Sequence, residues 1–272
     1  MTTALILRYG CTTTVGKIAG YMQHSVEHGT SPKSCDVLIR FGNISACSKK
    51  LAYNGSEQIE DSATKTTARV LFHNRSVTIP PTVLLGSSGK PRYLGLHTKK
   101  NLSGKWIARP EVHSGGAGFV IIDNDKTAAM AHLHTSGYLQ RLIDKKREFR
   151  VHCAHGRVLH VSIKPTMLNG GESNTISWER VPPSRCSASM LRLALKATDA
   201  IGLDFAAVDI IEDKKGKFYV LETNTGPSIP GERCPERYAR YFDWLIDGFP
   251  NRRKHLSHAK LHSVADLFKT PW

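Results

Sequence analysis

The sequence lacks any apolar run that approaches the roughly 20 residues needed to cross a bilayer. Its first residues, MTTALILRYGC, also lack the basic start and long apolar segment of a signal peptide. The six cysteines are scattered and include no CxxC pair, so neither a zinc ribbon nor a disulfide framework is indicated. We therefore expect a cytoplasmic protein with free thiols and no membrane partner.

Acidic residues are also scarce. The 272 residues include 23 Asp and Glu against 38 Lys and Arg, which gives a formal net charge of +15. The basic excess is concentrated in residues 1–100, whereas residues 201–272 are nearly balanced. A basic surface favours anionic partners such as nucleotides, acidic peptides or nucleic acid, and charge alone does not choose among them.

The chain begins with the pattern of a small α/β lobe. Ala4–Arg8 and Asp36–Phe41 are typical of buried strands, and a helix is expected between them over residues 15–27. Each strand ends in an arginine, an aromatic residue and a glycine. Because ligands bind beyond the carboxyl ends of parallel strands, we expect Arg8 and Arg40 to bind an acidic substrate at that edge.

The remaining chain alternates helices with paired strands. A helical pattern over residues 57–73 precedes Pro80-Pro81, and a domain boundary is expected near residue 86. A helix is expected over Ser187–Ala200, which Gly202 terminates. The expected strands are Lys105–Arg109, Phe119–Ile122, Tyr138–Ile143, Glu148–Cys153, Val158–Ile163, Phe205–Ile211 and Phe218–Asn224, and a helix over 232–247 precedes a basic tail.

Two carboxylates and an amide on the last pair of strands carry the strongest chemical signal. Glu222 and Asn224 lie two apart on one strand and face the same side. If the turn centres on Lys214-Lys215, Asp209 lies opposite Val220 and diagonal to Glu222. Such oxygen ligands suit Mg²⁺. The alternative is a solvated strand face, but Glu222 ends an apolar strand with no basic residue near it in the sequence.

This hairpin, GLDFAAVDII followed by FYVLETNTGPSI, resembles the signature of the ATP-grasp superfamily. Three upstream segments resemble, in the expected order, the lysine-bearing helix, the strand with its glycine-rich lid loop, and the stretch that binds adenine and ribose. The segments are NGSEQIEDSATKTTARVLFHNRSVTIPPT, WIARPEVHSGGAGFVII and YLQRLIDKKREFRVHCAHGRVL. The resemblance covers about residues 50–230 and is greatest to the glutamate-ligase and D-alanine–D-alanine-ligase branches.

The resemblance implies an α/β protein with the ATP-grasp fold, in which ATP binds between two antiparallel-sheet subdomains. It implies an N-terminal parallel α/β substrate lobe over 1–86, a lid subdomain over 87–143, a core subdomain over 144–250 and a basic tail over 251–272. The implied metal is Mg²⁺, for which Mn²⁺ can substitute, and its implied ligands are Asp209, Glu222 and Asn224.

The resemblance also assigns the other site residues. Lys65 and Arg109 would contact phosphates, and Arg150 and Lys164 would steady the transferred phosphoryl group or the substrate. The implied nucleotide contacts are Gly115, Gly116 and Gly118 in the lid loop, Gln140, Arg141, Leu142 and Ile143 around adenine, and Glu148 on the ribose. The chain departs from the family in having Arg109 where lysine is usual and Gln140 where an acidic residue is common.

The implied activity is an ADP-forming ligase that joins a carboxylate to an amine through an acyl phosphate. One substrate at least is expected to be anionic, and an acidic peptide or nucleic acid fits that description. A kinase with a hydroxyl acceptor is the alternative on the same fold. A non-catalytic nucleotide or nucleic-acid binder is a third, against which the intact carboxylate set argues.

Several residues also have a non-functional interpretation. Lys65 is equally well a solvated helix lysine, and Arg141, Lys145, Lys146 and Arg147 are interpreted as basic surface. The histidines His255, His258 and His262 are interpreted as part of a surface helix, because no carboxylate or cysteine accompanies them.

Overall fold

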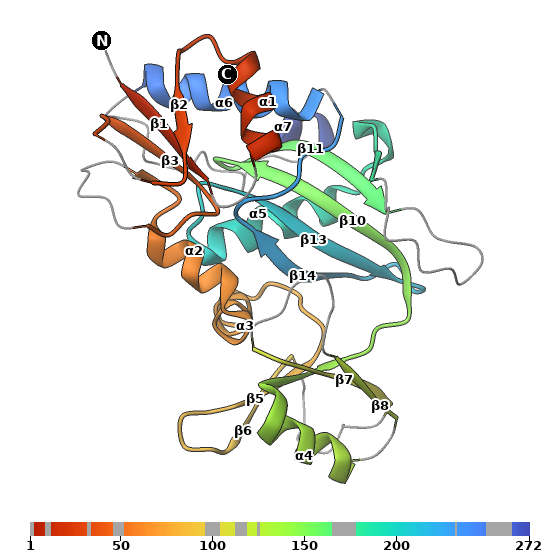
Figure 1. Ribbon diagram of the computed structural model, residues 1–272. Helices are drawn as coiled ribbons and strands as arrows, with labels where there is room; N and C mark the ends of the chain where they lie inside the picture. The colour runs from red at the N-terminus through yellow and green to blue at the C-terminus, as the bar shows by residue number, and fades with distance from the viewer. Residues whose placement is uncertain are drawn as a thin grey trace.

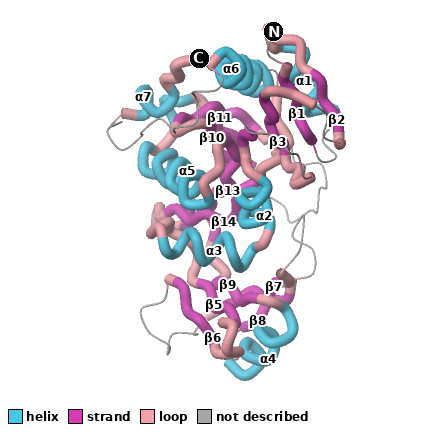
Figure 2. The backbone as a smooth tube through the Cα atoms, turned by 90° about the vertical axis from the view of Figure 1, so that its left-hand side faces the viewer, coloured by secondary structure: helices cyan, strands magenta, loops and turns pink. Residues whose placement is uncertain are grey.

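The computed structural model describes residues 3–8, 12–31, 34–45, 52–95, 104–111, 119–123, 126–164, 178–231, 233–248 and 263–272. These residues form three sheets that follow one another along the molecule (Figure 1), and the perpendicular view shows the same order (Figure 2). Within these ranges, no helix is long and apolar enough to span a membrane.

The first lobe is a four-stranded parallel sheet in the order β2-β1-β3-β4. Its strands are β1 (Ala4–Arg8), β2 (Glu27–Gly29), β3 (Val37–Phe41) and β4 (Ala52–Tyr53). Helix α1 (Thr12–Tyr21) packs against α6 (Arg233–Asp247). The expected parallel α/β unit is confirmed, but its helix ends at Tyr21 rather than near residue 27. The following residues pair with β1 as strand β2.

The core sheet lies in the middle and is antiparallel, in the order β12-β11-β10-β13-β14. Its strands are β10 (Lys145–Ala154), β11 (Arg157–Lys164), β12 (Glu179–Arg180), β13 (Phe205–Asp213) and β14 (Phe218–Asn224). Helix α5 (Ala188–Ile201) contacts four of these strands and ends at Gly202, whose φ of 80° suits a glycine. Leu191, Leu195, Val208 and Ile210 belong to the buried cluster between helix and sheet.

The third sheet, which we call the lid sheet, has the order β6-β5-β9-β7-β8 and is also antiparallel. It consists of β5 (Thr82–Leu85), β6 (Pro91–Leu94), β7 (Lys105–Arg109), β8 (Val120–Asp123) and β9 (Tyr138–Arg141), with α4 (Lys126–Ser136) packed on it. The boundary expected near residue 86 is therefore wrong. β5 pairs with β9 and buries Val83 beside Leu139, so the lid sheet begins at Thr82.

The helical pattern over residues 57–73 forms two helices instead of one. Helix α2 (Ser56–Ala63) ends and α3 (Lys65–Asn74) begins around Thr64, which has the extended backbone angles φ −75° and ψ 101°. The break turns the chain so that Lys65 opens α3. Helix α2 lies beside the core sheet, and α3 lies between the core sheet and the lid sheet in the two perpendicular views (Figures 1 and 2).

The last ten residues are part of the fold, although the sequence suggested a basic tail. The short helix η1 (Pro183–Arg185) contacts α7 (Val264–Phe268), which opens with a reciprocal capping box between Ser263 and Asp266. The ring of Trp272 packs 5.0 Å from Tyr241 and 5.1 Å from Trp244. The three histidines at 255, 258 and 262 lie outside the described residues.

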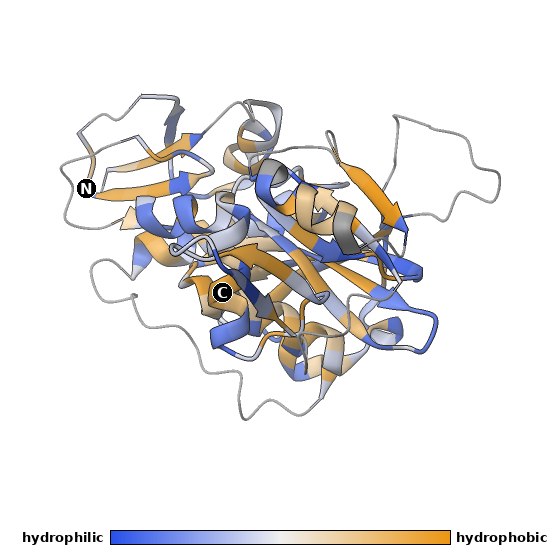
Figure 3. Cartoon of the chain, turned by 90° about the horizontal axis from the view of Figure 1, so that it is seen from below, coloured by the Kyte–Doolittle hydropathy of each residue, from blue (hydrophilic) through white to orange (hydrophobic). Residues whose placement is uncertain are grey.

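Hydropathy explains why these layers hold together. Seen from below, apolar residues dominate the strands, whereas the turns between them are mostly hydrophilic (Figure 3). Four buried clusters result, and the largest lies between the core sheet and α5. The polar face of the core sheet, opposite that cluster, is available for a site.

Candidate active site

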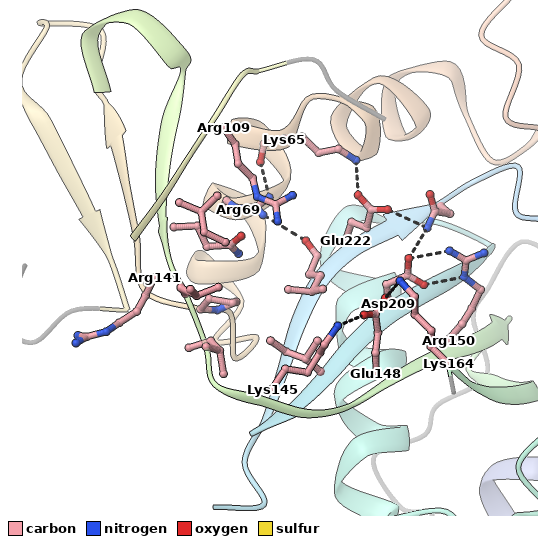
Figure 4. Close-up of a pocket in the computed structure, with 18 of the residues that line it drawn as sticks. Lys65, Arg69, Arg109, Arg141, Lys145, Glu148, Arg150, Lys164, Asp209 and Glu222 are labelled. Atoms are coloured by element: carbon pink, nitrogen blue, oxygen red, sulfur yellow. Dashed lines mark hydrogen bonds and ion pairs between the residues drawn. The ribbon is translucent and has the colours of Figure 1, made fainter. Parts of the chain in front are cut away.

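A cavity of about 620 Å³ lies where the lid sheet, the core sheet and α3 meet (Figure 4). Most of the site residues expected from the sequence line it, although they come from seven different elements and the β9–β10 connection. They are Lys65, Arg109, Gln140, Arg141, Leu142, Ile143, Glu148, Arg150, Lys164, Asp209, Glu222 and Asn224. The three lid-loop glycines, Gly115, Gly116 and Gly118, lie outside the described residues.

Asp209 and Glu222 lie directly opposite each other across β13 and β14, not on a diagonal as the turn position predicted. The register shifts between Asp209 and Ile210, so that Ile210 pairs with Val220 and Leu221 is left as the extra residue of a β-bulge. As the extra residue of the bulge, Leu221 lines the cavity. The shifted register brings the carboxylates of Asp209 and Glu222 together at the cavity wall.

Each of these carboxylates is held by a cation. Arg150 binds Asp209 with two parallel bonds, from Nε at 2.7 Å and from Nη2 at 2.9 Å. Lys65 Nζ lies 2.9 Å from Glu222 Oε2. The expectation that Glu222 has no basic partner is therefore wrong, because its partner comes from α3, which is distant in sequence. Lys65 is also buried, which excludes the solvated interpretation of that lysine.

Asn224 completes the cluster. Its Nδ2 lies 3.2 Å from Asp209 Oδ2 and 3.4 Å from Glu222 Oε1. The three side chains offer carboxylate and amide oxygens within one small volume, and Mg²⁺ is commonly bound by one or two carboxylates together with water and substrate phosphates. The donor set fits such an ion. In the described ranges, no group of three or more His, Cys, Asp or Glu residues competes with it as a metal site.

The two carboxylates differ in their electrostatic environment. Burial by itself would raise the pKa of Glu222, but Lys65 and the hydrogen bond from Asn224 outweigh it and hold that pKa below its usual value. Burial raises the pKa of Asp209, and the hydrogen bonds from Arg150 offset only part of this effect.

Glu148 lies on β10, two residues before Arg150 and near Asp209 on the same face of the core sheet, between two lysines (Figure 4). Lys145 Nζ is 2.6 Å from Glu148 Oε2, and Lys164 Nζ is 3.6 Å from its Oε1. The interpretation of Lys145 as plain surface is therefore wrong, because it lines the cavity. Arg147, from the same basic stretch, pairs with Glu212 outside the cavity.

Arg8 and Arg40 lie on opposite faces of the first sheet. In the pairing of β1 with β3, Leu7 lies opposite Arg40 and Arg8 lies opposite Phe41. A one-residue offset places side chains on opposite faces of a sheet. The shared arginine–aromatic–glycine ending thus conceals different orientations. Neither residue lines the cavity, and their role in substrate binding stays a prediction.

Arg69, Tyr138 and Trp178 are among the cavity-lining residues that sequence reasoning missed. Trp178 stacks on Arg150, with 4.6 Å from the guanidinium carbon to the ring centre. Arg69 occupies the buried stripe of α3, where the other positions are Lys65, Ala68 and Phe72. An arginine within an apolar stripe at helical spacing was the available signal for it.

No protein-family model matches the chain. The chain is 28% identical over 189 residues to a probable alpha-L-glutamate ligase of Parasynechococcus marenigrum (strain WH8102), a similarity that covers 65% of this chain. It spans only 39% of that relative's length.

Several solved structures resemble this chain along most of its length. The ATP-grasp ligase PsnB, complexed with a phosphomimetic variant of its minimal precursor, Mg and ADP, has a TM-score of 0.65 at 12% identity, covering 90% of this chain and 99% of that chain. D-alanine–D-alanine ligase from Bacillus anthracis, complexed with ATP, has a TM-score of 0.59 at 14% identity, covering 91% and 95%. N5-carboxyaminoimidazole synthetase from Staphylococcus aureus has a TM-score of 0.63 at 16% identity, covering 87% and 75%. At such identities the likeness establishes a shared fold.

Proposed function

We propose that this chain, which has the ATP-grasp fold, is an ADP-forming ligase that uses Mg-ATP to join a carboxylate to an amine. The observation that carries the proposal is the cluster of Asp209, Glu222 and Asn224 at the wall of a cation-rich cavity. Seven lysines and arginines line this cavity against three carboxylates, as a site for a polyphosphate requires.

The chemistry needs little beyond positioning and charge. An oxygen of the substrate carboxylate attacks the γ-phosphorus of ATP, and the bond to the β,γ-bridging oxygen breaks to release ADP. The amine nitrogen then attacks the carbonyl carbon of the acyl phosphate, phosphate leaves, and the nitrogen loses a proton. A bound Mg²⁺ would neutralise phosphate charge during the first step. Asp209, Glu222 and Asn224 would hold that ion.

The remaining residues bind and orient. Lys65 and Arg109 are proposed to contact phosphates, and Gln140 to Ile143 with Glu148 to bind the nucleoside. Arg150 and Lys164 are proposed to stabilise the phosphoryl group in transfer. Arg150 is well prepared for this role, because Asp209 and the ring of Trp178 fix its guanidinium from two sides.

A ligase is preferred over a kinase because of the bases available to the site. A hydroxyl acceptor needs a group that removes its proton. Among the described residues, no histidine lines the cavity. Each of the three carboxylates there is paired with a lysine or arginine: Glu148 with Lys145 and Lys164, Asp209 with Arg150, and Glu222 with Lys65.

The comparisons suggest which substrates to test first. One relative carries the name of a glutamate ligase, and PsnB has been solved with a precursor peptide. Glutamate and acidic peptides are therefore the first acids to assay, because their charge also suits a protein with a net charge of +15.

The proposal is tested by trapping the acyl phosphate. Purified protein is incubated with ATP, Mg²⁺, hydroxylamine and each candidate acid, and hydroxamate, ADP and phosphate are quantified. We expect the three products in equal amounts from wild type and at least a hundred-fold less from Glu222→Gln. A phosphorylated product without free phosphate would show a kinase instead. AMP with pyrophosphate would show that a different bond of ATP breaks.

A further inference from the structure

Arg69 is a buried arginine whose hydrogen-bonding capacity is largely unused. The residue is 3% exposed, on α3, and its side chain lines the cavity. Nη1 donates to the carbonyl oxygen of Lys65 at 3.3 Å and Nη2 to that of Leu221 at 3.4 Å, both long bonds. Its Nε has no partner. The guanidinium carbon lies 4.4 Å from the ring centre of Tyr138, a neutral group.

A second arginine, Arg109, is half-buried and lies close by. The side chains of Arg69 and Arg109 lie close together on the α3 side of the cavity (Figure 4). The Nε of Arg109 is likewise buried without a partner. Among the described residues neither arginine forms an ion pair, in contrast to Lys65, Lys145, Arg150 and Lys164, which each pair with a carboxylate of the cavity.

Two cations that lie close together without a counter-charge repel each other. Burial lowers the pKa of Arg69, and the charge of Arg109 lowers it further, against the opposite effects of Tyr138, Glu222 and Glu111. Glu222 already binds Lys65, and Glu111 accepts from the amide and hydroxyl of Thr66 at 3.1 and 2.7 Å. A buried charge without a counter-charge is costly, and an anionic ligand removes that cost.

We propose that Arg69 and Arg109 together form an anion subsite on the α3 wall that binds the polyphosphate of the nucleotide. This inference rests on the proposed function and adds Arg69 as a phosphate-binding residue. Two planar guanidiniums offer paired N–H donors to phosphate oxygens. The subsite lies across the cavity from Asp209 and Arg150 (Figure 4). The polyphosphate would therefore lie between Arg69 and Arg109 on one side and the metal-binding carboxylates on the other.

The rival explanation is that Arg69 only stabilises the packing of α3 against β14. It predicts the opposite change in the unfolding temperature of Arg69→Met without ligand. Replacing a buried unpaired charge by an apolar side chain of similar length is neutral or stabilising. We therefore expect Arg69→Met to unfold at the same or a higher temperature than wild type without ligand. Its stabilisation by Mg-ATP should shrink. A brace predicts a lower unfolding temperature without ligand and an unchanged stabilisation by ligand.

Binding calorimetry provides the second readout, with ATP, adenosine and inorganic tripolyphosphate as probes. We expect Arg69→Met to weaken ATP and tripolyphosphate binding by roughly ten- to a hundred-fold, and adenosine binding by less than about two-fold. Arg69→Lys should recover part of the loss. Arg75→Met is the matched control, since Arg75 is an exposed arginine at the end of the same helix, and it should change none of the three.

The outcomes separate this proposal from the one on which it rests. If wild type binds neither ATP nor tripolyphosphate, the proposed function fails. If wild type binds ATP and Arg69→Met binds it equally well, the anion subsite fails and the proposed function stands. An equal loss for adenosine and ATP would assign Arg69 to the base or to general packing, and would also overturn the subsite.

Discussion

Individual residues on the polar face of the core sheet continue the site into a buried region. Arg150 and Ser162 are cross-strand partners, and so are the next pair on the same face, His152 and His160. Tyr238 of α6 lies 3.2 Å from Nδ1 of His152. Burial lowers the pKa of His160 to about 4, and the nearby charges of Arg237 and Arg180 act in the same direction.

This depressed pKa predicts a pH-dependent stability. Between pH 6.5 and 4 the unfolded chain binds a proton at His160 that the folded chain does not, so the free energy of unfolding falls as the pH falls. One such proton changes that free energy by about 1.4 kcal/mol per pH unit. We expect His160→Gln to lose stability less steeply than wild type between pH 6.5 and 4.5, in urea unfolding series.

The control for this prediction is His134→Gln, which changes an exposed histidine on α4. The free energy of unfolding of this variant should fall with pH as steeply as that of wild type. His152 will retain some pH dependence in the His160 variant, because burial lowers its pKa as well. Identical slopes for wild type and His160→Gln would contradict the assignment of a neutral buried imidazole at this position.

At the level of elements, the sequence predicted the strands better than their register. β14 has the bounds that the alternation of apolar and polar residues predicted, and the convergence of Asp209, Glu222 and Asn224 followed from it. The bulge at Leu221 could not be predicted from this alternation, because a bulge depends on what the extra residue contacts in three dimensions. Here that contact is Arg69, a residue from a different helix.

Contacts between distant elements were hidden for the same reason. Neither the ion pair of Lys65 with Glu222 nor the bonds of Thr66 to Glu111 has a signal in the local sequence. The opposite faces of Arg8 and Arg40 likewise follow from a strand register that the repeated arginine–aromatic–glycine ending does not encode. Patterns thus predicted residue types at the site, and tertiary packing decided their partners.

The junction of the first lobe with the core sheet depends on two glycines in backbone contact. A Cβ on Gly226, just after β14, would lie 3.2 Å from Gly42 Cα and 3.2 Å from the carbonyl oxygen of Phe41. Backbone atoms cannot rotate away as side chains do. We expect Gly226→Ala to lower the free energy of unfolding by about 1–3 kcal/mol, measured by urea denaturation.

Gly16→Ala is the matched comparison for this substitution. Gly16 lies in α1 with open space around its Cβ position, so alanine should be neutral there or stabilising by about 0.5–1 kcal/mol. Equal effects of the two substitutions on the free energy of unfolding would contradict the close backbone contact of Gly226 with Gly42 and Phe41.

For the whole molecule, the order of three sheets places one cavity between the lid sheet and the core sheet. The sequence predicted this architecture through its resemblance to the ATP-grasp superfamily, and the solved structures confirm the fold. The division of the chain was less predictable. Residues 82–95 join the lid sheet and residues 263–272 pack onto the core, because each buries apolar side chains there.

The central claim is that this cavity binds ATP together with a divalent cation held by Asp209, Glu222 and Asn224. It is tested most directly by calorimetric titration of ATP into wild type and Glu222→Gln, each with and without Mg²⁺. Glutamine keeps an oxygen for Lys65 and removes the charge, so circular dichroism should show the same fold. We expect Mg²⁺ to strengthen ATP binding to wild type by at least roughly ten-fold.

In Glu222→Gln this gain should be lost, whereas binding without Mg²⁺ should be unchanged or stronger, because a carboxylate that repels phosphate has been removed. Absence of ATP binding by wild type would contradict the account as a whole. An equal gain from Mg²⁺ in the two proteins would contradict the placement of the cation at Glu222.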